Sequence, residues 1–114
     1  MMLLLNQYPT LQTRFGLTDS EIINFCQQWG IIKMALFGSI LRDDFRVDSD
    51  VDVLITFDSQ ARQGLLTLAK MKHELESRLH RPVDLVSEAS VKASDNWIRQ
   101  REILSTAQTI YEQG

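Results

Sequence analysis

Three aspartates follow a glycine–serine pair in an order that suits phosphate chemistry. Gly38 and Ser39 end one apolar run, and Asp50 and Asp52 open a second. Asp84 lies inside a third. Glycine lets a phosphate approach the backbone, a serine hydroxyl can donate to it, and carboxylates bind the Mg²⁺ that accompanies substrate phosphates. The order and spacing of these residues predict nucleotidyl transfer.

The carboxylates can meet if the apolar runs that hold them are neighbouring strands. Side chains two apart on a strand share a face, so Asp50 and Asp52 would point the same way, with Cα atoms roughly 6.6 Å apart. Asp84 would complete a triad from a strand roughly 4.8 Å away. Without a cation, three carboxylates would repel each other and lose hydration. We therefore expect Asp50, Asp52 and Asp84 to bind Mg²⁺.

A turn after the first apolar run would aim backbone N–H groups at an anion. Gly38 and Ser39 follow a predicted strand and precede a possible helical turn at 40–42. The N-terminus of such a turn favours negative charge, so we expect it to bind phosphate. Arg42 could contact the same phosphate or pair with one of the two aspartates that follow it. Both roles of Arg42 stay open.

A calcium loop is the competing interpretation of the acidic residues, because Asp48, Asp50 and Asp52 match the opening of an EF-hand. That loop needs glycine at its sixth position and a bidentate glutamate at its twelfth. The chain has Val53 and Ser59 at those positions. The sequence therefore favours a nucleotide-associated metal over a calcium loop.

Helices are predicted on both sides of the acidic motif. Thr18, with a glutamate three residues on, forms a capping box for a helix that ends at Gly30. Apolar residues recur every three or four positions over about 62–80, which predicts an amphipathic helix. Ser94 or Asp95 could cap a last helix.

Short apolar runs predict the strands. They lie at 31–37, 51–57 and 83–86, and a further apolar segment at 109–111 either extends the last helix or leaves it. Because strands and helices alternate, the expected fold is α+β, a small mixed sheet with helices packed on it.

Size and composition restrict the class of protein. The 114 residues suit a single domain over 1–114. A net charge of −3 provides no sequence-wide positive field for nucleic acid, and no run reaches the roughly 18 apolar residues of a membrane span. The lone Cys26 lies on an apolar stripe, which predicts an inert core thiol. A reducing cytoplasm is the expected compartment.

The combination of turn and aspartates resembles the DNA polymerase β-like nucleotidyltransferase superfamily, and the size resembles its minimal nucleotidyltransferase (MNT) branch, the antitoxin half of HEPN/MNT toxin–antitoxin modules. The motif match covers about 34–86. The resemblance implies a polymerase β palm-like fold in which Gly38 and Ser39 hold nucleotide phosphates. It also implies that Asp50 and Asp52 bind Mg²⁺ and that Asp84 is the third carboxylate.

The chemistry that the resemblance implies is transfer of AMP from ATP to a hydroxyl group, with pyrophosphate leaving. Two Mg²⁺ ions would clamp the attacking and leaving oxygens. Asp84 would accept the hydroxyl proton. The acceptor expected for the MNT branch is a tyrosine of a cognate HEPN ribonuclease toxin, held in a hetero-oligomer and silenced by the modification.

Two other functions stay open. A non-catalytic antitoxin could neutralise its toxin by binding alone, since the apolar residues Leu3, Leu5, Trp97 and Tyr111 near the two ends exceed what one small core needs. Transfer to a small molecule is the other alternative, although related enzymes of that kind usually carry an additional domain that shapes the acceptor site.

Overall fold

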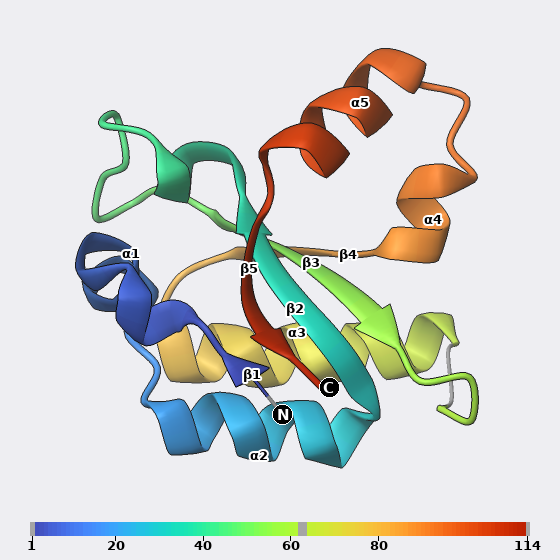
Figure 1. The fold of residues 1–114 in the computed structure, drawn as a ribbon, viewed down its shortest axis with the longest axis horizontal. Coiled ribbons are helices and arrows are strands. Elements are labelled where there is room, and N and C mark those ends of the chain that lie inside the picture. Colours follow the sequence, from blue (N-terminus) through green and yellow to red (C-terminus); the bar gives the residue numbers. More distant parts are fainter. Residues whose placement is uncertain (1, 62–63, 114) are drawn as a thin grey trace.

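A five-stranded mixed sheet forms the centre of the structure, a computed structural model that describes residues 2–61 and 64–113 (Figure 1). Its strands lie in the order β1-β5-β2-β3-β4. All neighbours are antiparallel except β3 and β4, which are parallel. The strands are β1 (Met2–Leu3), β2 (Ile31–Phe37), β3 (Val51–Phe57), β4 (Val83–Ser87) and β5 (Gln108–Glu112). This α+β architecture confirms the predicted fold class.

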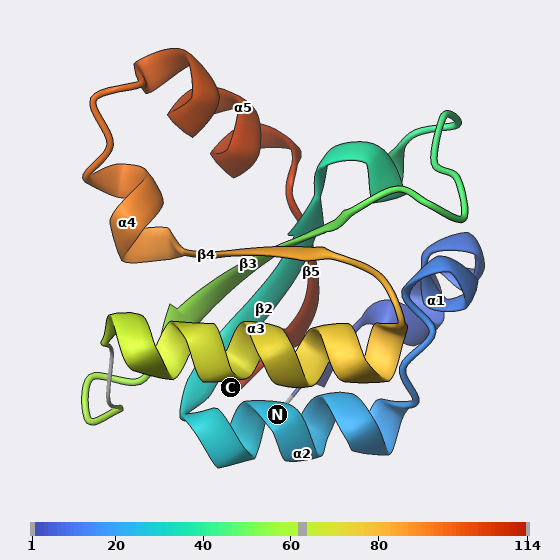
Figure 2. The ribbon, with the colours of Figure 1, turned by 180° about the vertical axis from the view of Figure 1, so that it is seen from behind.

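Helices cover both faces of the sheet. They are α1 (Pro9–Phe15), α2 (Asp19–Trp29), α3 (Leu65–Leu79), α4 (Glu88–Lys92) and α5 (Trp97–Thr106), with 3₁₀ turns at Leu5–Gln7 and Gly38–Leu41. Two views from opposite sides show α2 and α3 together along one face and α4 and α5 over the other (Figure 1 and Figure 2). The larger core lies under α2 and α3, and a smaller one lies under α4 and α5.

The pleat of β3 decides which face carries the chemistry. Val51, Val53 and Ile55 are fully buried in the larger core. Side chains alternate along a strand, so Asp52 and Leu54 point to the opposite face. Leu54 packs in the smaller core with residues of α4 and α5. Asp52 therefore faces the space beside α5.

Two predicted helices are confirmed. Thr18 caps α2 reciprocally, because its hydroxyl accepts from the Glu21 N–H at 3.2 Å and its N–H donates to the Glu21 carboxylate at 3.0 Å. The helix ends at Gly30, which has a left-handed φ of 68°. The described part of the second helix runs over Leu65–Leu79, since positions 62–63 of the predicted range lie outside the described residues.

The C-terminal prediction is confirmed in one part and wrong in another. The segment at 109–111 leaves the last helix, one of the two predicted alternatives, and forms β5 between β1 and β2. The cap of α5 is Asn96, whose side chain accepts from the Arg99 N–H at 3.1 Å, so Ser94 and Asp95 were the wrong choices. Ser94 instead accepts from the Asn96 N–H, which positions that cap.

The apolar residues near the two ends are mostly absorbed by the core. Leu5 and Tyr111 are buried, and Leu3 packs against them at the edge of the same core. The expected excess is therefore wrong for these residues, although Trp97 is 64% exposed. Cys26 is buried, which confirms that it is a core thiol, and burial raises its pKa to about 12. None of the described helices is long and apolar enough to cross a membrane.

Candidate active site

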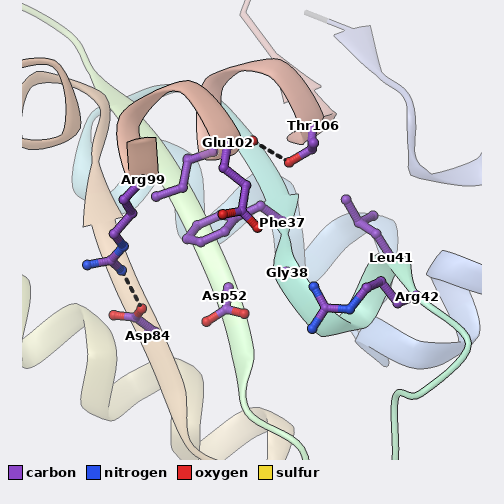
Figure 3. Close-up of a pocket in the computed structure, with 10 residues that line it drawn as sticks. Phe37, Gly38, Leu41, Arg42, Asp52, Asp84, Arg99, Glu102 and Thr106 are labelled. Atoms are coloured by element: carbon purple, nitrogen blue, oxygen red, sulfur yellow. Dashed lines mark hydrogen bonds and ion pairs between the residues drawn. The ribbon is translucent and has the colours of Figure 1, made fainter. Parts of the chain in front are cut away.

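The parallel pairing of β3 with β4 brings two of the predicted carboxylates together. Asp52 and Asp84 are direct partners in the strand register. Both line a cavity of about 380 Å³ between the sheet and α5 (Figure 3). The prediction that Asp84 lies on a strand next to that of Asp52 is confirmed.

Three segments far apart in the chain build this cavity. The end of β2 and the following 3₁₀ turn form one wall, the two aspartates form the floor, and α5 forms the opposite wall (Figure 3). The lining residues are Phe37, Gly38, Leu41, Arg42, Asp52, Asp84, Arg99, Glu102, Ile103 and Thr106. The wall from α5 supplies side chains that the motif did not include.

Gly38 is required by its place beside Asp52. Its φ of 74° lies in the left-handed region, which side chains other than glycine's rarely tolerate. A Cβ at this position would overlap the Asp52 carboxylate and lie 3.0 Å from its Cγ. The glycine therefore lets the backbone of the turn lie against the Asp52 side chain.

The protein compensates the negative charge of Asp52 only in part. Burial raises the pKa of Asp52 to about 6, and the charges of Asp84 and Asp50 add to the rise. Arg99 and Arg42 oppose it with smaller effects. A cation that prefers oxygen ligands would offset the repulsion between these carboxylates. Mg²⁺ is such a cation, and it binds one or two carboxylates together with substrate phosphates. Asp52 and Asp84 therefore fit a Mg²⁺ ion.

Asp50 lies outside the cavity lining. It precedes β3 and is exposed, close enough for its charge to act on Asp52. Ser39 donates its hydroxyl to the Asp50 carbonyl at 3.4 Å, which ties the turn to the start of β3. Within residues 2–61 and 64–113, no three His, Cys, Asp or Glu side chains are grouped as a metal site. The role of Asp50 as a third ligand stays a prediction.

Arg42 shows one of its two predicted roles, the pair with an aspartate, while its contact with phosphate stays a prediction. It lines the cavity, and its guanidinium pairs with Asp44 at 3.2 Å. Both side chains of the pair are more than half exposed, so the pair contributes little stability and leaves Arg42 available. The predicted helical turn is the 3₁₀ turn Gly38–Leu41, and Arg42 itself is extended.

Comparison with known proteins identifies the family. A model described as a nucleotidyltransferase domain matches residues 20–109, which include the turn and all three aspartates. The chain belongs to this family. Protein adenylyltransferase MntA of Thermococcus cleftensis is 34% identical over 67 residues, which are 59% of this chain and 66% of that relative. The chain thus matches about two thirds of the length of that relative.

Solved structures share the nucleotidyltransferase fold. A toxin–antitoxin crystal structure with AMP-PNP matches with a TM-score of 0.65 at 17% identity, over 85% of this chain and 75% of that one. The complex of tri-AMPylated Shewanella oneidensis HEPN toxin with MNT antitoxin matches with a TM-score of 0.59 at 16% identity, over 90% and 73%. The resemblance drawn from the motif is confirmed, and the chain is a nucleotidyltransferase.

Arg99 is a charged site residue of this nucleotidyltransferase that the sequence did not reveal. Its guanidinium donates to the Asp84 carboxylate at 3.3 Å from across the cavity (Figure 3). It is one of two exposed arginines of α5, and such side chains are typical of a solvated helix surface. Only the packing of α5 against the sheet gives Arg99 a place at the site.

Two other arginines hold the loop that joins the turn to the aspartates. Arg14 donates to the carbonyls of Ile40 at 2.9 Å and Arg42 at 2.7 Å. Arg81 donates to the carbonyls of residues 46 and 49 at 3.2 and 3.1 Å. Both guanidinium groups contact the Phe45 ring, with centroid distances of 5.5 and 4.7 Å. Arg14, Phe45 and Arg81 form a clamp that fixes the turn relative to Asp50.

Replacing Arg81 of this clamp with glutamine should lower kcat for nucleotidyl transfer by about tenfold, because a displaced loop misplaces the reacting groups. The matched control is Arg46→Gln in the same loop, since the Arg46 side chain has no hydrogen bond or ion pair within the described residues. Steady-state kinetics with both variants checks this. Equal kcat values for the two variants would show that the clamp does not position the site.

Proposed function

We propose that this nucleotidyltransferase transfers AMP from ATP to a hydroxyl group of a partner protein, a HEPN toxin, and thereby neutralises it. The observation that carries the proposal is the register pair of Asp52 and Asp84 beside the Gly38 turn. The Thermococcus cleftensis relative is named a protein adenylyltransferase, and the two similar complexes contain AMP-PNP or an AMPylated HEPN toxin. These names support both the substrate and the partner.

The residues of the site suggest a division of roles. The Gly38 turn would bind the phosphates through backbone N–H groups, with the Ser39 hydroxyl beside them. Asp52 and Asp84, joined by Asp50, would hold Mg²⁺, with two ions expected. Bound there, the metal supplies charge neutralisation to the attacking and leaving oxygens.

The transfer forms a bond between the acceptor oxygen and the α-phosphorus and breaks the bond to pyrophosphate. Asp84 would accept the acceptor's proton, because it lies on the cavity floor and is about half exposed. Arg42 on the opposite wall would offset the charge of the phosphates. The acceptor hydroxyl, a tyrosine of the toxin, would enter between the floor and α5.

The setting of the reaction follows from the same features. The described residues share one sheet, which supports a single domain over 1–114. The reduced, buried Cys26 and the use of ATP suit the cytoplasm. The net charge of −3 suits a protein partner rather than nucleic acid.

The test is transfer of label from ATP labelled at the α-phosphate. The purified chain, Mg²⁺, the labelled ATP and a cognate HEPN toxin should give a labelled HEPN protein. The double variant Asp50→Asn, Asp52→Asn should give none under the same conditions. Label that moves at the same rate with the double variant would overturn the proposed chemistry.

Neutralisation by binding alone is the second candidate, favoured by the apolar surface of α5. Trp97, Ile98 and Leu104 are 64%, 63% and 40% exposed, and such side chains are typical of protein interfaces. Cells that carry the toxin distinguish the two functions. If the double variant binds the toxin and still protects the cells, occlusion is the mechanism.

A further inference from the structure

The guanidinium of Arg99 pairs with Asp84, the carboxylate that is proposed to bind Mg²⁺. The two side chains form an ion pair of 3.3 Å, with 56% of the arginine and 46% of the aspartate exposed. Since an exposed pair of this kind is weak, a stronger cation can displace the guanidinium without a large cost. The pair is therefore suited to exchange rather than to structural support.

The first turn of α5 buries none of its side chains. Ile103 is the one buried side chain among residues 97–106, and it lies in the second half of the helix. Trp97 and Ile98, in the same turn as Arg99, are more than 60% exposed. Arg99 is also a long side chain on a flexible stem. Its guanidinium can therefore leave Asp84 without disturbing the packing of Ile103.

The displaced guanidinium would lie where phosphates arrive. Arg99 and Arg42 line opposite walls of the cavity, with Asp52 between them (Figure 3). Both arginine charges act on Asp52, so both lie within electrostatic reach of the floor. A triphosphate on the Gly38 turn would enter this gap, and arginine pairs well with phosphate oxygens.

We propose that Arg99 is an exchanging residue of the site: it neutralises Asp84 in the nucleotide-free protein and moves to the phosphates when metal and nucleotide bind. This inference rests on the proposed function. Its consequence is that metal alone binds poorly, because it must compete with Arg99 for Asp84. Metal and nucleotide together bind well, because the phosphates receive the displaced arginine.

Two titrations of Arg99→Gln test the exchange by calorimetry. Mg²⁺ alone should bind about two- to fivefold more tightly than to the wild type, because its competitor is gone. Mg²⁺ with AMP-PNP should bind about tenfold more weakly, because a phosphate contact is lost. Opposite changes for the two ligands are the signature of exchange, since a merely structural role would weaken both.

Two further variants serve as controls. Arg101→Gln, an exposed arginine of the same helix, should leave both affinities unchanged. Arg99→Lys keeps the charge and should restore the Mg²⁺ affinity of the wild type. Unchanged affinities in Arg99→Gln, or changes in the same direction for both ligands, would overturn the exchange.

Failure of the exchange can be separated from failure of the proposed function. If the wild type binds Mg²⁺ with AMP-PNP and transfers AMP, but Arg99→Gln has the same two affinities, only the exchange is wrong. If the wild type binds neither ligand, both the exchange and the proposed nucleotide chemistry are wrong.

Discussion

Asp52→Asn is expected to abolish nucleotidyl transfer and, at the same time, to raise the melting temperature of the metal-free protein. Asparagine keeps the shape of the side chain but lacks the charge that the proposed metal needs. Transfer should fall by about 10³-fold or more, as for other losses of transition-state charge stabilisation. Activity is measured with α-labelled ATP and stability by thermal unfolding in EDTA.

The stability gain follows from the pKa of Asp52. A rise from 3.8 to about 6 corresponds to about 3 kcal/mol for a fully shielded group, and solvent screening at this half-buried site reduces it to about 1 kcal/mol. The melting temperature should therefore rise by about 4 °C at pH 7. If Asp52→Asn melts at a lower temperature than the wild type, the charge of Asp52 does not destabilise the metal-free protein.

The pH dependence of this difference has a definite sign. Since the folded pKa of Asp52 is raised, the folded protein holds its proton more tightly than the unfolded chain. The protonated Asp52 side chain therefore contributes its full stabilisation below pH 3.8, and this stabilisation is lost as the pH rises through about 6. The wild type and Asp52→Asn should therefore melt close together at pH 4 and separate by pH 7. Saturating Mg²⁺ should stabilise only the wild type.

Gly38→Ala should impair both stability and activity. The methyl group would meet the Asp52 carboxylate, and the residue would have to keep a φ of 74° or rebuild the turn. The backbone penalty is about 1 kcal/mol or more, and the overlap adds about 1 to 2 kcal/mol. Because relief of the overlap displaces Asp52, transfer should fall by about 10²-fold.

Gly16→Ala is the matched control for this substitution. Gly16 also has a left-handed φ, 82°, but a Cβ there has nothing within 4 Å. The free energy of unfolding of Gly16→Ala should fall by only about 1 kcal/mol, the cost of the backbone conformation, and its activity should be unchanged. Chemical denaturation and transfer assays of the two variants separate backbone strain from the contact with Asp52. Equal activity in both variants would mean that Gly38 does not position the site.

The sequence predicted the parts of the site that are local. Gly38 and Asp52 are separated by a short loop. The turn is indicated by a glycine that ends an apolar run, and the strand is indicated by an apolar run of its own. The sequence predicted that Asp52 and Asp84 meet only if their two strands are neighbours. The order of strands in a sheet cannot be read from either strand alone. The prediction that Asp50 and Asp52 point the same way assumed that both lie on one strand. In the structure β3 begins at Val51, so Asp50 lies before the strand.

The remaining parts depend on contacts between distant segments. β5 is a strand because β1 and β2 pair with both of its edges, and its few apolar residues alone fit a helix end equally well. Arg99 enters the site only because Ile103 anchors α5 to the sheet. No local pattern distinguishes this arginine from Arg101 of the same helix.

The position of β5 has a consequence during synthesis on the ribosome. β5 lies inside the sheet, between β1 and β2, yet it is made after the other four strands. About 60 residues separate Asp52 from the end of β5, so at about 5–20 residues per second several seconds pass between them. Until β5 is made, the edge of β2 that it covers has no partner strand, and such an edge is a template for aggregation. The nascent chain therefore carries its glycine turn and acidic motif well before its sheet can close.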